Sequence, residues 1–171
     1  LENTPALAQS GIGQFNVKAS PLQMALVAAA IANDGILMKP HLMDSLRNQS
    51  GELIETYKPV IWRTVLPRQD ALSLQLAMET IATSGTATNL AIPSIRVGGK
   101  TGTAQINADQ PDDTHGWIVG YAGPQDGEAT LAISVILESV PGEGQLTGGT
   151  DAAPVAKIVL TEALRALGIL E

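Results

Sequence analysis

Three apolar segments near the C-terminal end of the sequence set the strongest limit on the fold. Their composition is that of β-strands, and they cover Ile95–Gln105, Trp117–Ala122 and Leu131–Leu137. A polar stretch, AQINADQPDDTH, separates the first two and is predicted to be a loop, whereas Asp126-Gly127 between the second and third is a hairpin signal. Successive strands with tight connections pair antiparallel, so we expect an antiparallel sheet.

A final helix is expected to cover this sheet. The glycine-rich stretch VPGEGQLTGGT leads to a helical segment from about Ala152 to Leu167, with Pro154 in its first turn and Gly168 at its end. Polar residues form a single stripe along this segment, at positions 157, 161 and 165. We therefore expect the helix to be largely buried, lying across one face of the three strands.

These elements place the chain in the α+β class, with an antiparallel sheet of three main strands packed by a C-terminal helix, plus a further helical part. Trp117 and Tyr121 fall on the same side of their strand and are expected to pack beneath the C-terminal helix. Three strands under one helix leave two open edges and a limited core. We expect one edge to be functional and the other to accept further strands.

Helices and a hairpin are predicted in the first half of the sequence. Ser20-Pro21-Leu22-Gln23 supplies an N-cap, a proline at the first helical position and a capping-box glutamine, and this helix should end at Asp34-Gly35. Residues 36–66 have extended character, with a turn at 48–51 between HLMDSLR and ELIETY. A second helix is expected over about residues 69–83, and its apolar face comprises Leu74, Ala77, Met78 and Ile81.

The composition excludes several classes of function. Acidic residues outnumber basic ones, 17 to 10, which argues against a nucleic-acid binder because such proteins need a basic face. The absence of cysteine excludes a disulfide framework and a thiolate metal site, and we expect neither a metal nor a cofactor. No apolar run reaches the roughly 18–20 residues of a membrane span. Because the sequence starts at Leu1 rather than at a methionine, we expect it to be a piece of a longer chain.

The stretch VGGKTGTAQ, residues 97–105, is the strongest candidate for a binding site. Thr101 and Thr103 share one side of an extended chain, while Gly102 leaves the backbone open to a ligand lying against it. Lys100 adds a cation beside the two hydroxyls and the row of amide N–H groups, a set that can hold an anion. On this stretch alone, a glycine-rich surface turn with a solvated lysine is an equal alternative.

Four segments stand in order along the chain: GIGQFNVKASPLQMALVAAAIANDG at 11–35, SGTA at 84–87, GGKTGTAQ at 98–105 and GWIVGYAGP at 116–124. In this order they resemble the C-terminal half of the transpeptidase domain of class B penicillin-binding proteins, and the first segment is most similar to actinobacterial members. The Lys-Thr-Gly element is also a signature of serine β-lactamases. The resemblance implies a partial penicillin-binding-protein/serine β-lactamase-like fold, in which the Lys-Thr-Gly strand is an edge strand of a five-stranded sheet and one wall of the active site.

The resemblance also implies roles for the residues of this wall. Lys100 would help to bind the terminal carboxylate of the substrate and shape the field around the nucleophile, and the hydroxyls of Thr101 and Thr103 would bond the same carboxylate. The backbone N–H of Thr103 would be one of two oxyanion-hole donors, placed where charge develops on the attacked carbonyl. A peptidoglycan stem peptide ending in D-Ala-D-Ala would add along the edge strand, past Gly102. β-Lactam antibiotics are the other implied ligands.

Two motifs of the family are absent from the sequence. No serine is followed by lysine at the third position or by asparagine at the second, so both the Ser-x-x-Lys pair of nucleophile and base and the Ser-x-Asn motif are missing. We therefore expect residues 1–171 to be the C-terminal portion of a transpeptidase domain whose N-terminal portion carries the nucleophile. This chain alone is expected to be inactive, and its open sheet edge is expected to pair with the missing strands or to support self-association.

The expected function of the parent protein is D,D-transpeptidation, the cross-linking of peptidoglycan through a serine acyl-enzyme. The resemblance implies a location on the extracytoplasmic face of the bacterial cell membrane, with an upstream transmembrane anchor and a role in cell shape or division. Two alternatives are a β-lactam sensor or other non-catalytic module of the same fold, and a serine β-lactamase. The helix SPLQMALVAAAIANDG and Gln105 after GKTGTA favour the transpeptidase. His115 is a weak candidate for a general base, because a lone histidine at a loop end is usually solvated.

Overall fold

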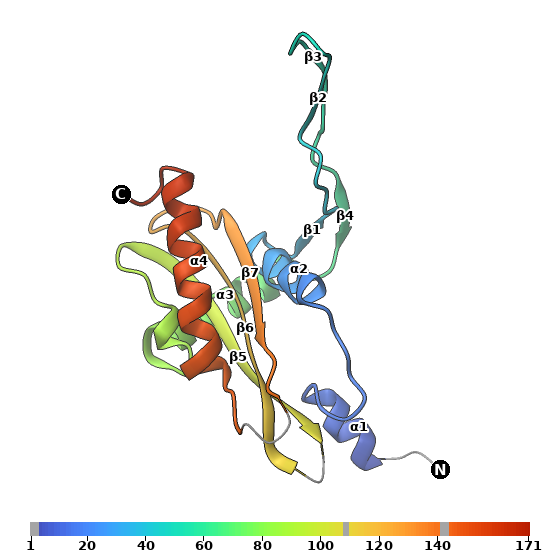
Figure 1. The fold of residues 1–171 in the computed structure, drawn as a ribbon, viewed down its shortest axis with the longest axis vertical. Coiled ribbons are helices and arrows are strands. Elements are labelled where there is room, and N and C mark those ends of the chain that lie inside the picture. The colour runs from blue at the N-terminus through green and yellow to red at the C-terminus, as the bar shows by residue number, and fades with distance from the viewer. Residues whose placement is uncertain (1–3, 108–109, 141–143) are drawn as a thin grey trace.

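A three-stranded antiparallel sheet forms the centre of the computed structural model, which describes residues 4–107, 110–140 and 144–171. Strands β5 (Ile95–Asn107), β6 (Gln110–Pro124) and β7 (Leu131–Leu137) follow one another along the chain and lie side by side in that order (Figure 1). The register places Gly102 opposite Trp117, and Trp117 opposite Ile136. The predicted antiparallel sheet is confirmed, with β5 and β7 at its two edges among the described strands.

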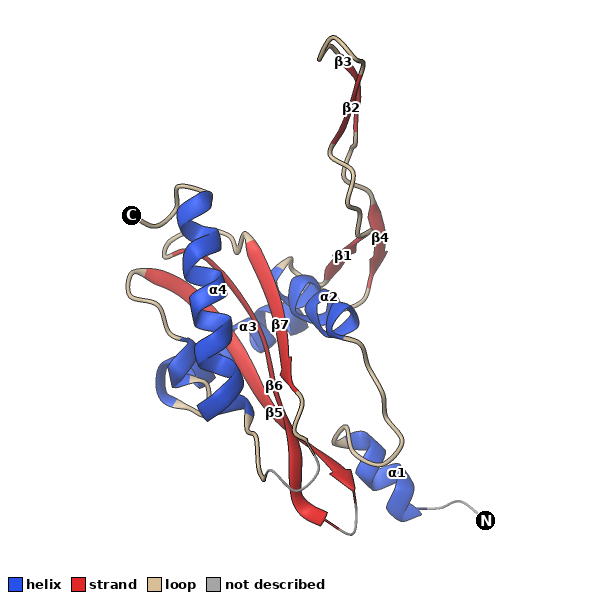
Figure 2. Ribbon diagram, in the orientation of Figure 1, coloured by secondary structure: helices blue, strands red, loops and turns tan. Residues whose placement is uncertain are grey.

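Helices contact both faces of the sheet (Figure 2). Helix α4 (Ala153–Ala166) crosses one face, while α2 (Pro21–Ala32) and α3 (Arg68–Ser84) pack against the other. Buried apolar side chains fill the space between α4 and the sheet, among them Ile118, Ala122, Ala156, Leu160 and Leu164. The arrangement agrees with the predicted α+β class.

Trp117 and Tyr121 lie on the face of β6 opposite α4, so the prediction that they pack beneath the C-terminal helix was wrong. Ile118 faces α4, and alternate residues of a strand point to opposite faces. Tyr121 is fully buried, and its single hydroxyl proton is shared between two acceptors in α3, Oε1 of Glu79 at 3.0 Å and the carbonyl of Gln75 at 3.2 Å. The alternation of side chains along a strand correctly predicts that Trp117 and Tyr121 share one face of the sheet. It does not predict which helix covers that face.

Helix α4 is less buried than its composition predicted. Val155, Ile158 and Val159 are 39%, 65% and 52% exposed. Their spacing of three and four residues puts them on one face of the helix, away from the buried Leu160 and Leu164. The helix therefore carries an exposed apolar strip, Val155–Ile158–Val159, in addition to the face that packs on the sheet.

The polar residues 104–107 and 110–115 belong to the sheet, which corrects their prediction as a loop. Ala104 pairs with His115, and Gln105 pairs with Thr114; residues 108 and 109, within the predicted loop, lie outside the described part of the chain. The ladder between β6 and β7 ends at Gly116, so this part of the β5–β6 hairpin runs beyond the third strand. Its polar groups find other partners there: Thr114 Oγ1 donates to the carbonyl of Leu146 at 2.8 Å.

The start and end of α2 follow the prediction. Ser20 Oγ accepts from the Gln23 backbone N–H, and the Gln23 side chain accepts from the Ser20 N–H, which completes the capping box. Gly35, with φ of 85°, adopts the left-handed conformation that glycine tolerates best. The preceding helix α1 (Thr4–Gly11) was not predicted, and none of its residues is buried.

The segment between α2 and α3 forms a projecting arm (Figure 1). Strands β1 (Ile36–Met38) and β4 (Ile61–Thr64) pair at its base, and β2 (Ser45–Arg47) and β3 (Leu53–Thr56) pair beyond them. The turn lies at the predicted place, because Asn48 Oδ1 accepts from the backbone N–H groups of Ser50 and Glu52. The extended character of residues 36–66 and the predicted hairpin are confirmed.

Helix α3 occupies the predicted range, and half of its predicted apolar face is correct: Met78 is buried and Ile81 packs against the core. Its buried residues are Ala71, Gln75, Met78 and Ala82, whereas Leu74 is 40% exposed and Ala77 is also exposed. Gln75 belongs on the inner face because its amide bridges two elements: Nε2 donates to the carbonyl of Ile31 at 2.7 Å, and Oε1 accepts from Arg96 at 2.9 Å. Among the residues described, none of the helices combines the length and apolar character that a membrane crossing requires.

Candidate functional site

The Lys-Thr-Gly-Thr stretch lies on the exposed edge of β5, as the sequence predicted. Lys100 is exposed and its Nζ donates a hydrogen bond of 2.6 Å to the carbonyl of Thr101. By register, Lys100 and Gly102 share a face with Val119 and Trp117, so the side chains of Thr101 and Thr103 begin on the opposite face. Because β5 is an edge strand, groups from both faces can reach the space beside it.

The backbone of this edge is open on its outer side. The carbonyl of Thr101 accepts from Lys100 Nζ, and the carbonyl of Thr103 accepts from Gln14 Nε2 at 3.3 Å, so neither carbonyl is directed at β6. In an antiparallel ladder, the N–H and C=O of one residue point to the same side of the strand. The N–H groups of Thr101 and Thr103 therefore also point outward, away from the sheet.

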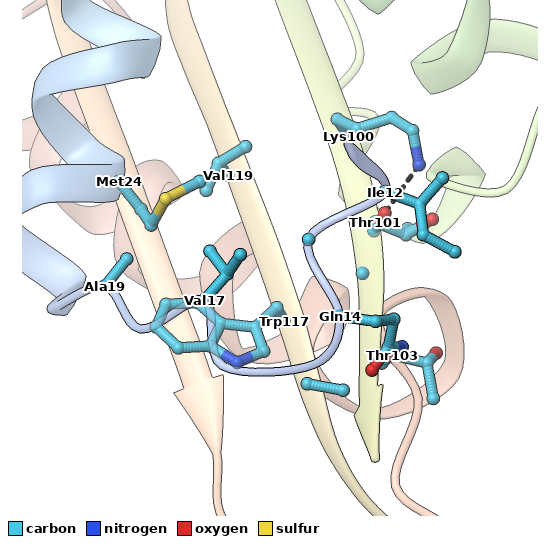
Figure 3. A pocket seen from close by; sticks show the side chains of 13 residues that line it. Ile12, Gln14, Val17, Ala19, Met24, Lys100, Thr101, Thr103, Trp117 and Val119 are labelled. Atoms are coloured by element: carbon cyan, nitrogen blue, oxygen red, sulfur yellow. Dashed lines mark hydrogen bonds between the residues drawn. The ribbon is translucent and has the colours of Figure 1, made fainter. Parts of the chain in front are cut away.

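A cavity of about 370 Å³ lies against this edge (Figure 3). The segment 12–19 and helix α2 form one side of it, through Ile12, Gln14, Val17, Ala19 and Met24. Strands β5 and β6 form the other side, with Trp117 and Val119 beside Lys100, Thr101 and Thr103. The cavity thus has mainly apolar walls and a polar edge supplied by β5.

Thr101 is held by two further segments. Its Oγ1 lies 2.7 Å from Oγ1 of Thr86, in the loop that follows α3. Gly149 approaches Thr86 so closely that a Cβ on it would lie 2.4 Å from the Thr86 carbonyl oxygen, and the same Cβ would be in ordinary contact with Thr101 Cγ2 at 3.7 Å. Asn89 Nδ2 donates to the carbonyl of Gly149 at 2.9 Å, which fixes that approach.

A polar network anchors the inner end of β5. Arg96 Nε donates to Glu79 Oε1 at 2.8 Å, and the same carboxylate oxygen accepts from the Tyr121 hydroxyl. Burial raises the pKa of Tyr121, and the neighbouring Glu79 carboxylate raises it further. Because the network joins α3 to β5 and β6, it fixes the strand that carries the candidate site.

The chemistry of this edge is suited to anions and extended peptides. It offers an ammonium group, the hydroxyl of Thr103 and the outward N–H groups of Thr101 and Thr103, which are all donors. The described residues that line the cavity include no serine, histidine or carboxylate. The site can therefore bind and polarise a ligand, but its lining offers no serine nucleophile and no histidine or carboxylate base.

The four segments that carry the family resemblance, 11–35, 84–87, 98–105 and 116–124, each contribute a residue at the cavity or beside it. The first contributes Gln14, the second Thr86, the third Thr101 and Thr103, and the fourth Trp117. Gln14 and Thr86 lie within segments that carry the family resemblance, but no pattern in the sequence predicted a role for them, because their contacts join distant parts of the chain. His115 takes no part: it is not among the residues lining the cavity, and its Nδ1 accepts from the Ser139 N–H at 3.1 Å.

A model of the family "penicillin binding protein transpeptidase domain" matches residues 2–161. The peptidoglycan D,D-transpeptidase PbpA of Mycolicibacterium smegmatis is 38% identical over 167 residues, covering 96% of this chain and 33% of the relative. A penicillin-binding protein A structure from M. tuberculosis, a ceftriaxone acyl-enzyme complex, superposes with a TM-score of 0.82 at 34% identity, covering 95% of this chain and 36% of the other. The penicillin G acyl-enzyme complex of that protein gives a TM-score of 0.79 at 31% identity, with the same coverage. The chain spans about a third of the length of these relatives.

Proposed function

The chain belongs to the penicillin-binding protein transpeptidase domain family, and we propose that it forms the Lys-Thr-Gly wall of the active site in a serine-type peptidoglycan D,D-transpeptidase. One observation carries the proposal: the edge of β5 presents Lys100 and the outward backbone of Thr101 and Thr103 to a cavity, in a chain whose relatives include named D,D-transpeptidases. The M. tuberculosis relative whose structures are acyl-enzyme complexes supports the same chemistry.

Each residue of the wall has a proposed role. Lys100 attracts the terminal carboxylate of the stem peptide or of a β-lactam, and the hydroxyls of Thr101 and Thr103 donate hydrogen bonds to it. The backbone N–H of Thr103 stabilises the negative charge that develops on the attacked carbonyl oxygen. Gly102 carries no side chain, so a peptide ending in D-Ala-D-Ala can lie along the strand edge.

We propose that residues 1–171 are the C-terminal portion of the catalytic domain, because no Ser-x-x-Lys or Ser-x-Asn motif occurs among them. The nucleophilic serine, its base lysine and the second oxyanion donor would come from the N-terminal portion. The serine hydroxyl would add to the penultimate D-Ala carbonyl while its proton passes to the base, and the terminal D-Ala would leave. An amine of a second stem peptide would then take the acyl group, which forms the cross-link.

The remaining portion of the domain has two surfaces to cover. The outer edge of β7 is unpaired among the described strands. The Val155–Ile158–Val159 strip of α4 is exposed on the neighbouring layer. A strand added at β7 and an apolar surface placed on α4 would satisfy both, whereas in the isolated chain the same surfaces would favour self-association.

The cellular location that we propose for the parent protein follows from its proposed substrate, peptidoglycan. Peptidoglycan lies outside the cytoplasm, so the parent protein would act on the extracytoplasmic face of the cell membrane, held by an upstream transmembrane helix. Its role would be wall synthesis during cell-shape maintenance or division.

Labelling of the full-length protein with a fluorescent penicillin tests the function. We expect a labelled band on a denaturing gel that excess unlabelled penicillin abolishes, with the adduct on a serine outside residues 1–171. A protein that takes no label, or a label that maps to a residue within 1–171, would contradict the proposal.

A further inference from the structure

Thr86 makes a direct contact with the proposed carboxylate-binding edge. Its hydroxyl oxygen lies 2.7 Å from that of Thr101, and either atom can be the donor. We infer that Thr86 is a positioning residue, which orients the Thr101 hydroxyl so that its proton points to a carboxylate in the cavity. This inference rests on the proposed function, because the ligand carboxylate is the one assigned there to Lys100, Thr101 and Thr103.

The hydroxyl group of Thr101 has a single proton to donate. A carboxylate only accepts hydrogen bonds, so Thr101 can bind it only by donating its own proton. If Thr101 donated to Thr86, no proton would remain for the ligand. When Thr86 donates instead, Thr101 keeps its proton for the carboxylate, and a chain of two hydroxyls strengthens each hydrogen bond in it.

The backbone beside the Thr86–Thr101 contact is closely packed. Gly149 lies against the Thr86 carbonyl so tightly that any side chain there would force a shift, and it also lies against the methyl group of Thr101. The Asn89 side chain donates a hydrogen bond to the carbonyl of Gly149. The loop after α3, strand β5 and the segment before α4 therefore meet at the Thr86–Thr101 contact.

Thr86 acts through Thr101 alone. Thr86 is not among the residues that line the cavity, whereas Thr101 and Lys100 are. Lys100 reaches the backbone carbonyl of Thr101, while Thr86 reaches its hydroxyl, so the two residues hold different groups of the same threonine. The Lys100 charge draws the carboxylate in, and the Thr86–Thr101 pair gives the directional hydrogen bond.

The test compares two ligands on variants of the full-length protein. Benzylpenicillin carries the carboxylate, and its methyl ester does not. We expect Thr86→Val, which keeps the side-chain shape but removes the hydroxyl, to lower the second-order rate constant of acylation by benzylpenicillin about fivefold to tenfold, the size of one hydrogen bond. The slower reaction of the methyl ester should change by less than about twofold. Thr86→Ser, which retains the hydroxyl, should restore the benzylpenicillin rate.

Two controls separate positioning from folding. Thr88→Val makes the same change at an exposed threonine in the following turn (Thr88–Leu90) and should leave both rates unaltered. A Thr86→Val/Thr101→Val double variant should be no slower with benzylpenicillin than Thr101→Val alone, because both changes remove the same interaction.

Three outcomes would overturn the inference. Equal losses with the acid and the ester would indicate a general structural effect, and an unchanged benzylpenicillin rate in Thr86→Val would show that Thr101 needs no positioning. A wild-type protein that benzylpenicillin does not acylate would remove the proposed function and the inference with it. Normal wild-type acylation with an unaffected Thr86→Val variant would remove the inference alone.

Discussion

The hydroxyl of Tyr121 donates a hydrogen bond of 3.0 Å to Oε1 of Glu79, which ties the middle strand of the sheet to α3. The same oxygen accepts from Arg96, so one carboxylate joins three elements at the inner end of the candidate site. Burial and the adjacent carboxylate both raise the pKa of Tyr121, so the neutral hydroxyl is the form that fits the folded protein.

This raised pKa predicts a loss of stability in alkaline solution. Above the ordinary tyrosine pKa of 10.0, the unfolded chain releases the proton that folded Tyr121 retains, so the free energy of unfolding falls as the pH rises. Tyr121→Phe should cost about 1–2 kcal/mol at pH 7 through its lost hydrogen bonds, but it should show a shallower decline above pH 10. Denaturant titrations at neutral and alkaline pH measure both effects. Tyr57→Phe, on the projecting arm, is the matched control, and a decline as steep in Tyr121→Phe as in wild type would disprove the assignment.

The second prediction concerns Lys100 in the full-length protein. Removing one partner of a desolvated charge pair costs about 2–5 kcal/mol, so Lys100→Ala should slow penicillin acylation about 30-fold or more. Lys100→Arg should retain part of the rate, because the charge survives while its position shifts. Thermal melts should change little for either variant, since Lys100 is exposed and outside the core. Wild-type acylation by a folded Lys100→Ala protein would show that β5 does not hold the anion.

The third prediction concerns residues 1–171 alone. This chain should form no covalent adduct with a fluorescent penicillin, because a carboxylate-binding wall without an activated nucleophile cannot acylate. A denaturing gel reads the result directly, with the full-length protein as the positive control. A labelled band at the mass of the chain would mean that one of its own residues is the nucleophile.

The exposed strip on α4 and the open edge of β7 predict self-association of the isolated chain. Ile158→Lys places a charge in the centre of the strip and should shift the equilibrium toward the monomer in sedimentation experiments. Leu42→Lys makes the same change at a fully exposed position on the projecting arm and should have no effect. If Leu42→Lys favoured the monomer and Ile158→Lys had no effect, the chain would associate through the arm instead. A wild-type chain that stays monomeric at all concentrations would refute the prediction.

Local signals in the sequence predicted local structure well. The capping box at Ser20 and Gln23 needs only four consecutive residues, and the turn at Asn48 forms its hydrogen bonds within four residues. The proposed anion-binding role of Lys100–Thr103 was inferred in the same way, because the donors lie next to one another on one strand. Such features are fixed by neighbours along the chain.

Features fixed by tertiary packing were harder to predict. The helix period correctly placed α3, but it could not show that Gln75 would be buried by its bonds to Ile31 and Arg96. Strand alternation could not tell that Tyr121 faces α3. The contacts of Thr101 with Thr86, and of Thr103 with Gln14, join segments 15 and 89 residues apart, and no pattern within either segment reveals them.

The consecutive order of β5, β6 and β7 has a consequence for the kinetics of folding. A sheet made of successive hairpins needs only short loops to close, whereas the Gln14–Thr103 contact must close a loop of 89 residues. We expect the Lys-Thr-Gly edge to be assembled early, from nearby parts of the chain, and the 12–19 segment to dock on it late. The ligand-binding edge would thus exist during folding before the cavity beside it has closed.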